Sequence, residues 1–505
     1  MDSKIRPLSR REMLKVMGAM TAGTALAACA PQAVPAPTPA PTEAPKPTEA
    51  TAAPTEVPAA PTEAPAAPTE APAAAEAVKL TMMWRTDPNE VPMVADLQKL
   101  FAEKNPGLTM ETTHVPWDEF EPKLMTQYAA GAAPDVYGTG GTNPYIERWV
   151  RGMVLELNAF VDAEGAAFTE DLYPVGLNAY KKKGKLAALT FAVLASGVWL
   201  NATRFDEGGV PYPSIDWTDE KAFTWDDMIA AAKQLTVESG GRKEKFGLNC
   251  GHAGPWYYTR LWGQDLVSQE DYDGGVLHKL QTDKPEVLEA LIGGVQARAD
   301  TIWKDQVAPS PDTANSLSQM GPMLKTGAIA MEFTGGWAVW GDMPKEFKFR
   351  AAINPKGGVG GNGTRVRNIW AEPLQISSQT KSPNEAWQWV RFMTVDTDAV
   401  RTELKYRNLT PVTRGSFDFF VETQQDRLAA MTVDEQKTFY KGAIEQANTT
   451  VPDHILVGWA KVRDVLNSSL EPVWLNEETA EEAVTAMLPK VQEAIDANLK
   501  ELGLT

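Results

Sequence analysis

The chain has 505 residues, of which 43% are hydrophobic and 23% charged, and its formal net charge at pH 7 is −18. A chain of this length is too long for a single hydrophobic core, so we expect a soluble protein with more than one domain. The negative charge argues against binding to nucleic acid or to an anionic membrane surface, because both require clustered Lys and Arg side chains.

The first 28 residues have the features of an export signal. Residues 9–15 (SRREMLK) resemble the twin-arginine signal, and residues 26–29 (LAAC) resemble a bacterial lipobox. The apolar stretch between them is too short for a transmembrane helix. We therefore predict that 1–28 is a signal peptide and that Cys29 is lipidated, which would anchor the exported protein to the outer face of the cytoplasmic membrane. The other cysteine, Cys250, is expected to be a small buried apolar residue.

Residues 29–76 are predicted to form a disordered tether. The motif Pro-Thr-Glu begins at Pro41, Pro47, Pro54, Pro61 and Pro68, and residues 30–76 contain no aromatic side chain. A segment of Pro, Ala, Thr and Glu cannot bury a core and should be extended. At ~3.1 Å per residue it could reach on the order of 140 Å from the lipid.

The folded body begins with an alternation of predicted strands and helices. Residues 78–84 (VKLTMMW) form a buried strand pattern, and 91–105 form a helix pattern. Residues 108–115 predict a second strand, 118–128 a second helix, and 135–137 a third strand. This order is typical of an α/β fold with a parallel sheet covered by helices.

Three later helices have marked N-termini. Ser382 precedes Pro383 and a glutamate, and Thr479 and Thr224 are each followed three residues later by an acidic residue. These patterns predict helix caps. In open α/β sheets ligands bind beyond the carboxyl ends of the strands, so the loops after Met83, Val136 and Met331 are the expected ligand loops.

Several motifs of the body occur together in a known family. Residues 101–107 (FAEKNPG), 131–136 (GAAPDV), 199–211 (WLNATRFDEGGVP), 224–226 (TWD) and 325–331 (KTGAIAM) follow one another in a fixed order. This series, which extends over roughly residues 78–500, resembles the extracellular solute-binding proteins of ABC importers, family 1, the maltose-binding type.

The resemblance implies a two-lobe α/β clamp of the type II periplasmic-binding-protein kind, in which the ligand is enclosed between the lobes. The chain would cross between lobes near 189–196 and 370–377. Lobe 1 would comprise 77–190 and 375–415, and lobe 2 would comprise 191–374 and 416–505. One segment departs from the family pattern, because 184–190 (GKLAALT) lacks the family's tyrosine and proline before the first hinge.

Tryptophans in the expected ligand loops are candidate platforms for a sugar ring, because an indole stacks on the apolar face of a pyranose. Trp84 follows the first strand, and Trp337 follows Gly335 and Gly336, where the missing Cβ could let a ligand approach. The resemblance places a sugar-stacking tryptophan at Trp337 and another at Trp459. For Trp256, Tyr257 and Trp370 the alternatives of core and site stay open. Positions on helical stripes, near caps or behind the ligand loop are expected in the core: Trp225, Trp340, Trp387, Trp389 and Trp474.

Polar partners for a ligand are expected from the same loops and from the returning segment. The candidates are Asp87, Asp118, Thr139, Asn143 and Arg407.

Enzyme motifs are weak. Residues 358–363 match GxGxxG, but a strand pattern follows where a dinucleotide fold needs a helix. The four histidines are scattered and give no metal-ligand spacing, so we expect no cofactor and no metal. We predict a non-enzymatic, monomeric substrate-binding component of an ABC importer, which takes a neutral sugar or oligosaccharide and docks on the transmembrane subunits of a permease. The alternatives are a secreted carbohydrate-active hydrolase and a ligand sensor for a membrane kinase.

Overall fold

A computed structural model describes residues 77–138, 145–250, 254–407, 409–446 and 451–505. The predicted signal peptide, Cys29, the tether, Thr139 and Asn143 lie outside the described residues. The strands are β1 (Val78–Arg85), β2 (Leu108–Val115), β3 (Val136–Tyr137), β4 (Lys181–Lys182), β5 (Lys185–Leu186), β6 (Leu189–Asn201), β7 (Val237–Ser239), β8 (Arg242–Asn249), β9 (Ile329–Gly335), β10 (Phe349–Ala352), β11 (Ile369–Ile376) and β12 (Thr410–Pro411).

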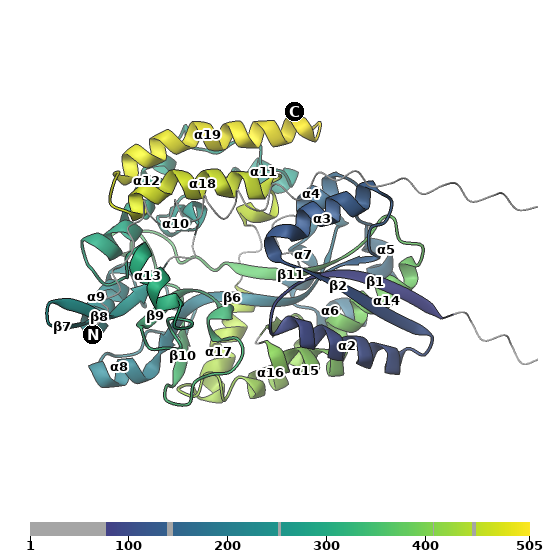
Figure 1. The fold of residues 1–505 in the computed structure, drawn as a ribbon, viewed down its shortest axis with the longest axis horizontal. Coiled ribbons are helices and arrows are strands. Elements are labelled where there is room, and N and C mark those ends of the chain that lie inside the picture. Colours follow the sequence, from purple (N-terminus) through teal and green to yellow (C-terminus); the bar gives the residue numbers. More distant parts are fainter. Residues whose placement is uncertain (1–76, 139–144, 251–253, 408, 447–450) are drawn as a thin grey trace, which may run out of the picture. The chain divides into compact units, whose positions relative to one another are not determined.

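Helices lie on either side of the sheet, and the chain after β12 is mostly helical (Figure 1). Those in the first half are α2 (Glu90–Lys104), α3 (Trp117–Ala129), α4 (Tyr145–Val150), α5 (Asn158–Glu164), α6 (Ala166–Asp171), α7 (Pro174–Asn178), α8 (Ala202–Gly208), α9 (Trp225–Leu235) and α10 (Pro255–Leu261). Those in the second half are α11 (Gln269–Gly274), α12 (Pro285–Trp303), α13 (Pro311–Ser318), α14 (Pro383–Val395), α15 (Thr397–Tyr406), α16 (Phe417–Thr423), α17 (Val433–Glu445), α18 (Trp459–Trp474) and α19 (Ala480–Glu501). Short 3-10 turns are η1 (Gly336–Val339), η2 (Val359–Gly361), η3 (Arg414–Ser416) and η4 (Pro452–His454).

The strands assemble around β6. Within the described residues, ten strands share one sheet with the order β2-β1-β3-β11-β6-β9-β8-β7, while β10 and β12 also pair with β6. Strand β1 is parallel to β2 and to β3, and β8 is parallel to β9, whereas the pairs that involve β6 are antiparallel. The sheet therefore has a parallel portion on each side of an antiparallel junction, and its β7 edge pairs antiparallel with β8.

The junction is formed by β6 and β11. All 13 residues of β6 are buried, as the mostly apolar run LTFAVLASGVWLN favours for a strand covered on both faces. Its first half pairs with β11 and β12, and its second half pairs with β9 and β10. Strand β11 also pairs with β3 through Gln375 and Ile376. The two segments predicted to cross between lobes are thus these two strands, although the lobe boundaries themselves stay a prediction.

Local structure follows the sequence patterns closely in the first α/β units. Strand β2 has the predicted bounds, and each end of β1, α2, α3 and β3 lies within one residue of the predicted bound. Thr224 and Thr479 form complete capping boxes with Asp227 and Glu482. Ser382 is the N-cap residue of α14, but its side chain makes no capping hydrogen bond, so that part of the prediction is wrong.

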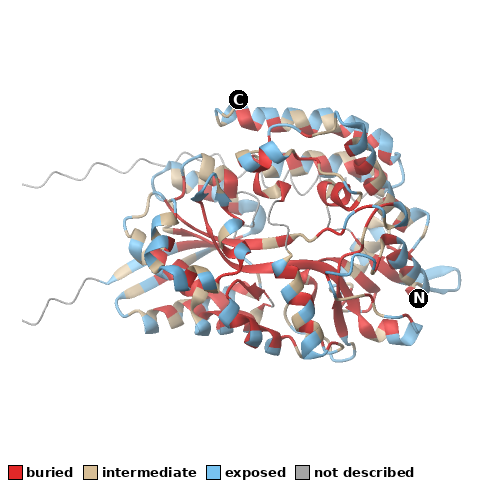
Figure 2. Cartoon of the chain, turned by 180° about the vertical axis from the view of Figure 1, so that it is seen from behind, coloured by how far each residue is buried: buried red, intermediate tan, exposed pale blue. Residues whose placement is uncertain are grey.

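The hydrophobic core lies along the sheet, where Figure 2 shows the strands as mostly buried and the outer faces of the helices as exposed. Trp225, Trp387 and Trp389 are buried, as predicted, and so is the thiol-bearing Cys250. Burial raises the pKa of the Cys250 thiol. Among the described residues, no helix is both long enough and apolar enough to span a membrane.

Candidate ligand-binding site

Three of the nominated tryptophans line one cavity of about 780 Å³. Trp256 comes from α10, Trp370 from β11, and Trp459 is the first residue of α18. The structure thus brings together side chains that are more than 200 residues apart in the chain. Aromatic walls with a few polar groups are the usual composition of a small-molecule site, so this cavity is the candidate ligand site.

Trp337 adjoins the same cluster. Its ring lies 4.8 Å from that of Trp370 between centroids, with the two planes inclined at 62°. A Cβ on Gly335 would lie 2.1 Å from the Trp337 ring, whereas one on Gly336 would meet only ordinary contacts of 3.5 Å or more, with Trp199 nearest. The sequence pattern had indicated that the missing Cβ of Gly335 lets a ligand approach. In the structure, Gly335 is instead required because the Trp337 indole folds back over this backbone.

Trp337 also lines a second cavity of about 530 Å³, together with Trp340 and Glu332. Trp340, which was predicted to be core, is half-buried, and it packs against the core on one side while it lines this cavity on the other. Burial raises the pKa of Glu332 to about 7, although a hydrogen bond with Asn249 opposes the shift. Sequence reasoning missed Glu332, which could have been noticed as the one acidic residue in the apolar strand β9.

Trp459 is held by a carboxylate that sequence reasoning also missed. Its indole N–H donates to Asp453 Oδ1 at 2.9 Å, and the guanidinium carbon of Arg463 lies 4.5 Å from the ring centroid. Burial raises the pKa of Asp453 to about 6, and the hydrogen bond from Trp459 and the charge of Arg260 oppose the shift. Asp453 and Arg463 line the main cavity beside Trp459, so the indole has a polar group on each side.

Asp118 lies near this group but in an adjacent cavity of about 300 Å³. That cavity is lined by Trp117 and Asp118 of α3 and by Trp459 and Arg463 of α18. An oxygen of Asp118 lies 3.8 Å from the guanidinium of Arg463. Trp459 and Arg463 therefore connect the two cavities, and α3 supplies the opposite wall of the smaller one.

Two nominated residues, Trp84 and Arg407, are instead part of the core. Both are fully buried, and both hydrogen-bond to the carboxylate of Glu90, at 2.8 Å from Trp84 Nε1 and at 2.5 Å from Arg407 Nη1. A Cβ on Gly138 would collide with the Trp84 ring, whose other neighbour is Phe191 at 5.9 Å between centroids. With its faces and its N–H occupied, the Trp84 indole is not available to a ligand, and neither Trp84 nor Arg407 lines a described cavity, so we leave both out of the proposed site.

Glu90 is the centre of a buried charge network. Arg85 Nε donates to Glu90 at 2.7 Å, Arg407 also bonds Glu403, and Glu372 lies 3.6 Å from Arg85. Burial alone would raise the pKa of Glu90, but the charges of Arg407 and Arg85 outweigh it and lower the pKa to about 2. Burial raises the pKa of Glu403 to about 7, against the attraction of Arg407. The network joins the end of β1, the start of α2, β11 and α15.

The remaining nominated residues have local structural roles. Asp87 accepts a hydrogen bond from the backbone N–H of Asn89 at 2.8 Å, directly before α2. Tyr257 is buried with its ring 5.2 Å from that of Phe333, and it lines none of the described cavities.

The glycine-rich segment 358–363 is followed by an irregular stretch and β11 rather than by a helix, in accord with the prediction that it is not a dinucleotide-binding turn. No group of three or more metal-ligating side chains occurs in the described part of the chain.

The mixed α/β fold, with its sheet portions joined through β6 and β11, is that of the two-lobe solute-binding proteins. The sequence pattern of the family described as bacterial extracellular solute-binding protein matches residues 87–399. The chain therefore belongs to that family, and the resemblance inferred from its motifs is confirmed.

Known relatives agree with this assignment. A binding protein of Brucella abortus is 23% identical over 401 residues, which cover 76% of this chain and 85% of that protein. A multiple sugar-binding protein of Streptococcus mutans is 24% identical over 317 residues, which cover 60% and 68% of the two chains. An ABC substrate-binding protein of Listeria monocytogenes, solved in complex with cycloalternan, has a TM-score of 0.66 at 21% identity and covers 85% of this chain and 99% of its own.

Proposed function

We propose that this chain is the substrate-binding component of an ABC importer and that it captures a neutral sugar or oligosaccharide for delivery to a membrane permease. The observation that carries the proposal is the cavity lined by Trp256, Trp370 and Trp459, with Asp453 and Arg463 beside the last of these. Indoles provide apolar faces for pyranose rings, while a carboxylate and a guanidinium can bond their hydroxyls. The sugar-bound Listeria neighbour and the sugar-binding Streptococcus relative favour the same class of ligand.

The mechanism is capture without reaction. The described lining of the main cavity belongs to the proposed lobe 2, and the adjacent cavity between α3 and α18 brings lobe 1 beside it. A ligand that enters both cavities would contact both lobes and stabilise the arrangement in which they enclose it, and that form would dock on the transmembrane subunits. Export and lipidation at Cys29, with the Pro-rich tether, would keep the monomeric binding body near its permease. The two lobes we propose retain the bounds expected from the sequence, 77–190 with 375–415 and 191–374 with 416–505.

The test is to titrate the full chain with mono- and oligosaccharides and to measure binding by calorimetry and by intrinsic tryptophan fluorescence. We expect saturable binding of at least one neutral sugar, which Trp459→Ala should weaken. Trp387→Phe is the control, because that ring stacks on Phe160 and lines none of the described cavities. A folded wild-type protein that binds no neutral sugar would contradict the proposed ligand class. Release of cleaved product from glycosides by the purified protein would contradict capture without reaction.

A further inference from the structure

The main cavity continues well beyond the tryptophan cluster, along one face of α18. Its lining includes Trp459, Arg463, Asn467, Glu471 and Trp474, which follow one another at intervals of three or four residues. Such residues form a single stripe on a helix. At ~1.5 Å rise per residue, the stripe is about 22 Å long. The cavity thus has two ends, with a tryptophan at each.

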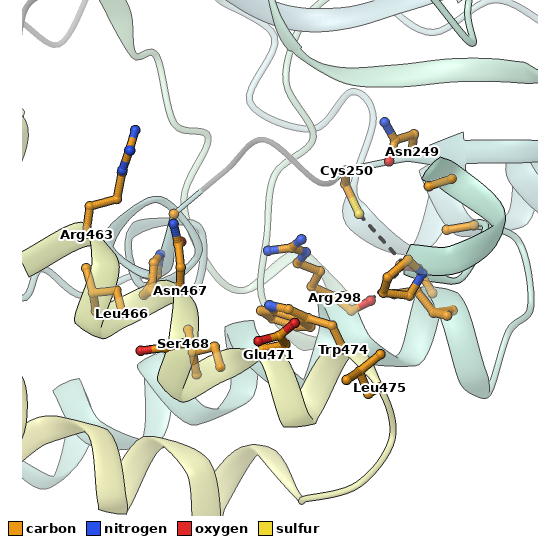
Figure 3. A pocket seen from close by; sticks show the side chains of 18 of the residues that line it. Asn249, Cys250, Arg298, Arg463, Leu466, Asn467, Ser468, Glu471, Trp474 and Leu475 are labelled. Carbon is orange, nitrogen blue, oxygen red and sulfur yellow. Dashed lines mark hydrogen bonds between the residues drawn. The ribbon is translucent and has the colours of Figure 1, made fainter. Parts of the chain in front are cut away.

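The far end is formed by Trp474 and Arg298. The guanidinium carbon of Arg298, from α12, lies 3.9 Å from the centroid of the Trp474 ring (Figure 3). This cation–π contact fixes both side chains. The backbone oxygen of Trp474 also accepts a hydrogen bond from Trp303 Nε1 at 3.2 Å, which holds the end of α18 against α12. The far end is therefore ordered by contacts that exist without any ligand.

Arg298 keeps donors available at this end. Across the described residues, its guanidinium forms no ion pair with a carboxylate and donates no hydrogen bond to a side chain. An arginine held on an indole with free N–H groups presents a flat apolar surface and several donors together. Trp474 was expected to be core from its helical position, but it is only half-buried and lines the cavity.

The middle of the stripe is polar. Asn467 and Glu471 are exposed, lie on the same side of α18 as Arg463 and Trp474, and offer an amide and a carboxylate to a bound molecule (Figure 3). The lining carries both signs of charge, with Arg298 and Arg463 against Glu471 and Asp464. Such a mixture suits a neutral ligand rich in hydroxyl groups better than a strongly charged one.

We infer that Trp474 and Arg298 form a distal subsite, which receives the far end of an oligosaccharide bound from the Trp459 end of the cavity. This inference rests on the proposed function. A volume of about 780 Å³ and a polar stripe several sugar rings long exceed what a monosaccharide can occupy. A ring bound at Trp474 adds contacts only when the chain is long enough to reach it. Affinity should therefore rise with chain length, and the last increment should depend on Trp474.

The experiment measures calorimetric affinities of the full chain for two homologous series, α-1,4-linked glucose oligomers and β-1,4-linked glucose oligomers of one to seven units. For the series that binds, we expect Trp474→Ala to weaken the longest oligomers about tenfold and to leave the shortest bound oligomer unchanged. Arg298→Met should have the same length-dependent effect. Trp459→Ala should weaken all lengths, and Trp387→Phe none.

The outcomes separate this inference from the function on which it rests. Equal affinity of the wild-type chain for short and long oligomers, or an equal effect of Trp474→Ala on every length, would overturn the distal subsite while leaving a sugar-binding function intact. Failure of both series to bind would overturn the sugar ligand and the subsite with it. Thermal melts of each variant show that it is folded, and Arg298→Met provides the same test if Trp474→Ala does not fold.

Discussion

Two tryptophan–carboxylate pairs of this protein have the same bond and opposite surroundings. The N–H of Trp84 donates to Glu90 at 2.8 Å, and that of Trp459 donates to Asp453 at 2.9 Å. Glu90 is fully buried and surrounded by arginines, which lower its pKa to about 2. At Asp453 the charge of Arg260 opposes the effect of burial but does not outweigh it, so the pKa rises to about 6.

The difference separates a structural indole from an available one. Phe191 and Gly138 pack against the Trp84 ring, its N–H is bonded to Glu90, and the pair holds β1 to α2. The Trp459 ring lines two cavities, and its carboxylate lines one of them. An indole N–H bonded to a carboxylate therefore does not identify a ligand site by itself. The site is indicated by the absence, among the described residues, of arginines bonded to that carboxylate and by a cavity beside the indole.

The largest effect is expected from a substitution at Glu90, which breaks the Trp84–Glu90 pair and its ion pairs with two arginines. Glu90→Gln removes the negative charge that faces two buried guanidinium groups, and an uncompensated buried charge typically costs about 3–5 kcal/mol. We expect a loss of that size in the free energy of unfolding at pH 7, measured by urea denaturation. The folded-state pKa of Glu90 is depressed, so its stabilising contribution is present above the unfolded value of 4.5 and is lost as the pH falls toward 2.

The control for Glu90→Gln is the same substitution at a surface ion pair. Glu111 pairs with Lys79 at 2.6 Å, but both side chains are more than half exposed. Glu111→Gln should change the free energy of unfolding by less than about 1 kcal/mol. Equal effects of the two substitutions would mean that the buried network does not stabilise the fold.

A second, smaller effect is expected on ligand affinity when the Trp459 indole is removed. Trp459→Ala should lower the affinity for a bound sugar by about 2 kcal/mol, or roughly 30-fold, because it removes a central aromatic contact. The free energy of unfolding should change less than in Trp84→Ala, where a fully buried ring leaves a cavity that typically costs about 3–5 kcal/mol. Calorimetry and denaturation of both variants check this. Ligand affinity that falls only in proportion to the unfolded fraction would show that Trp459 has no direct role.

Much of the fold could be predicted from the sequence because its local signals are strong. The alternation in 78–137 and the boxes at Thr224 and Thr479 depend on near neighbours in the chain, whereas the crossing at β6 was expected only from the family resemblance. The motif at Ser382 predicted a cap that is wrong, because the Ser382 side chain does not make the hydrogen bond that the motif allows.

The site was less predictable, since residues meet there from distant segments. Trp256, Trp370 and Trp459 were nominated separately, and only the tertiary structure shows that they share a cavity. Trp84 and Arg407 were nominated from loop positions, but their burial depends on Glu90, and no sequence pattern reveals that partnership. Trp474 has a helical position typical of the core, and its exposure to the cavity depends on α12.

The smallest effect sharpens the comparison, because the substitution is again carboxylate to amide and the expected sign is reversed. The folded-state pKa of Asp453 is raised from 3.8 to about 6, so the folded protein binds this proton more tightly than the unfolded chain. In the wild-type protein this group therefore lowers stability as the pH rises from about 4 to 6, and the penalty is complete above that range. A shift of this size corresponds to about 3 kcal/mol in full, but Asp453 is only half-buried, so we expect about 1 kcal/mol after solvent screening. Asp453→Asn, whose amide oxygen can still accept the Trp459 N–H, should thus be more stable than the wild-type protein by about 1 kcal/mol at pH 7.5 and equal to it near pH 4. Urea denaturation of the ligand-free full chain at the two pH values measures both differences. A loss of stability at pH 7.5, as expected for Glu90→Gln, would mean that the carboxylate of Asp453 is compensated after all and that the two pairs do not differ in kind.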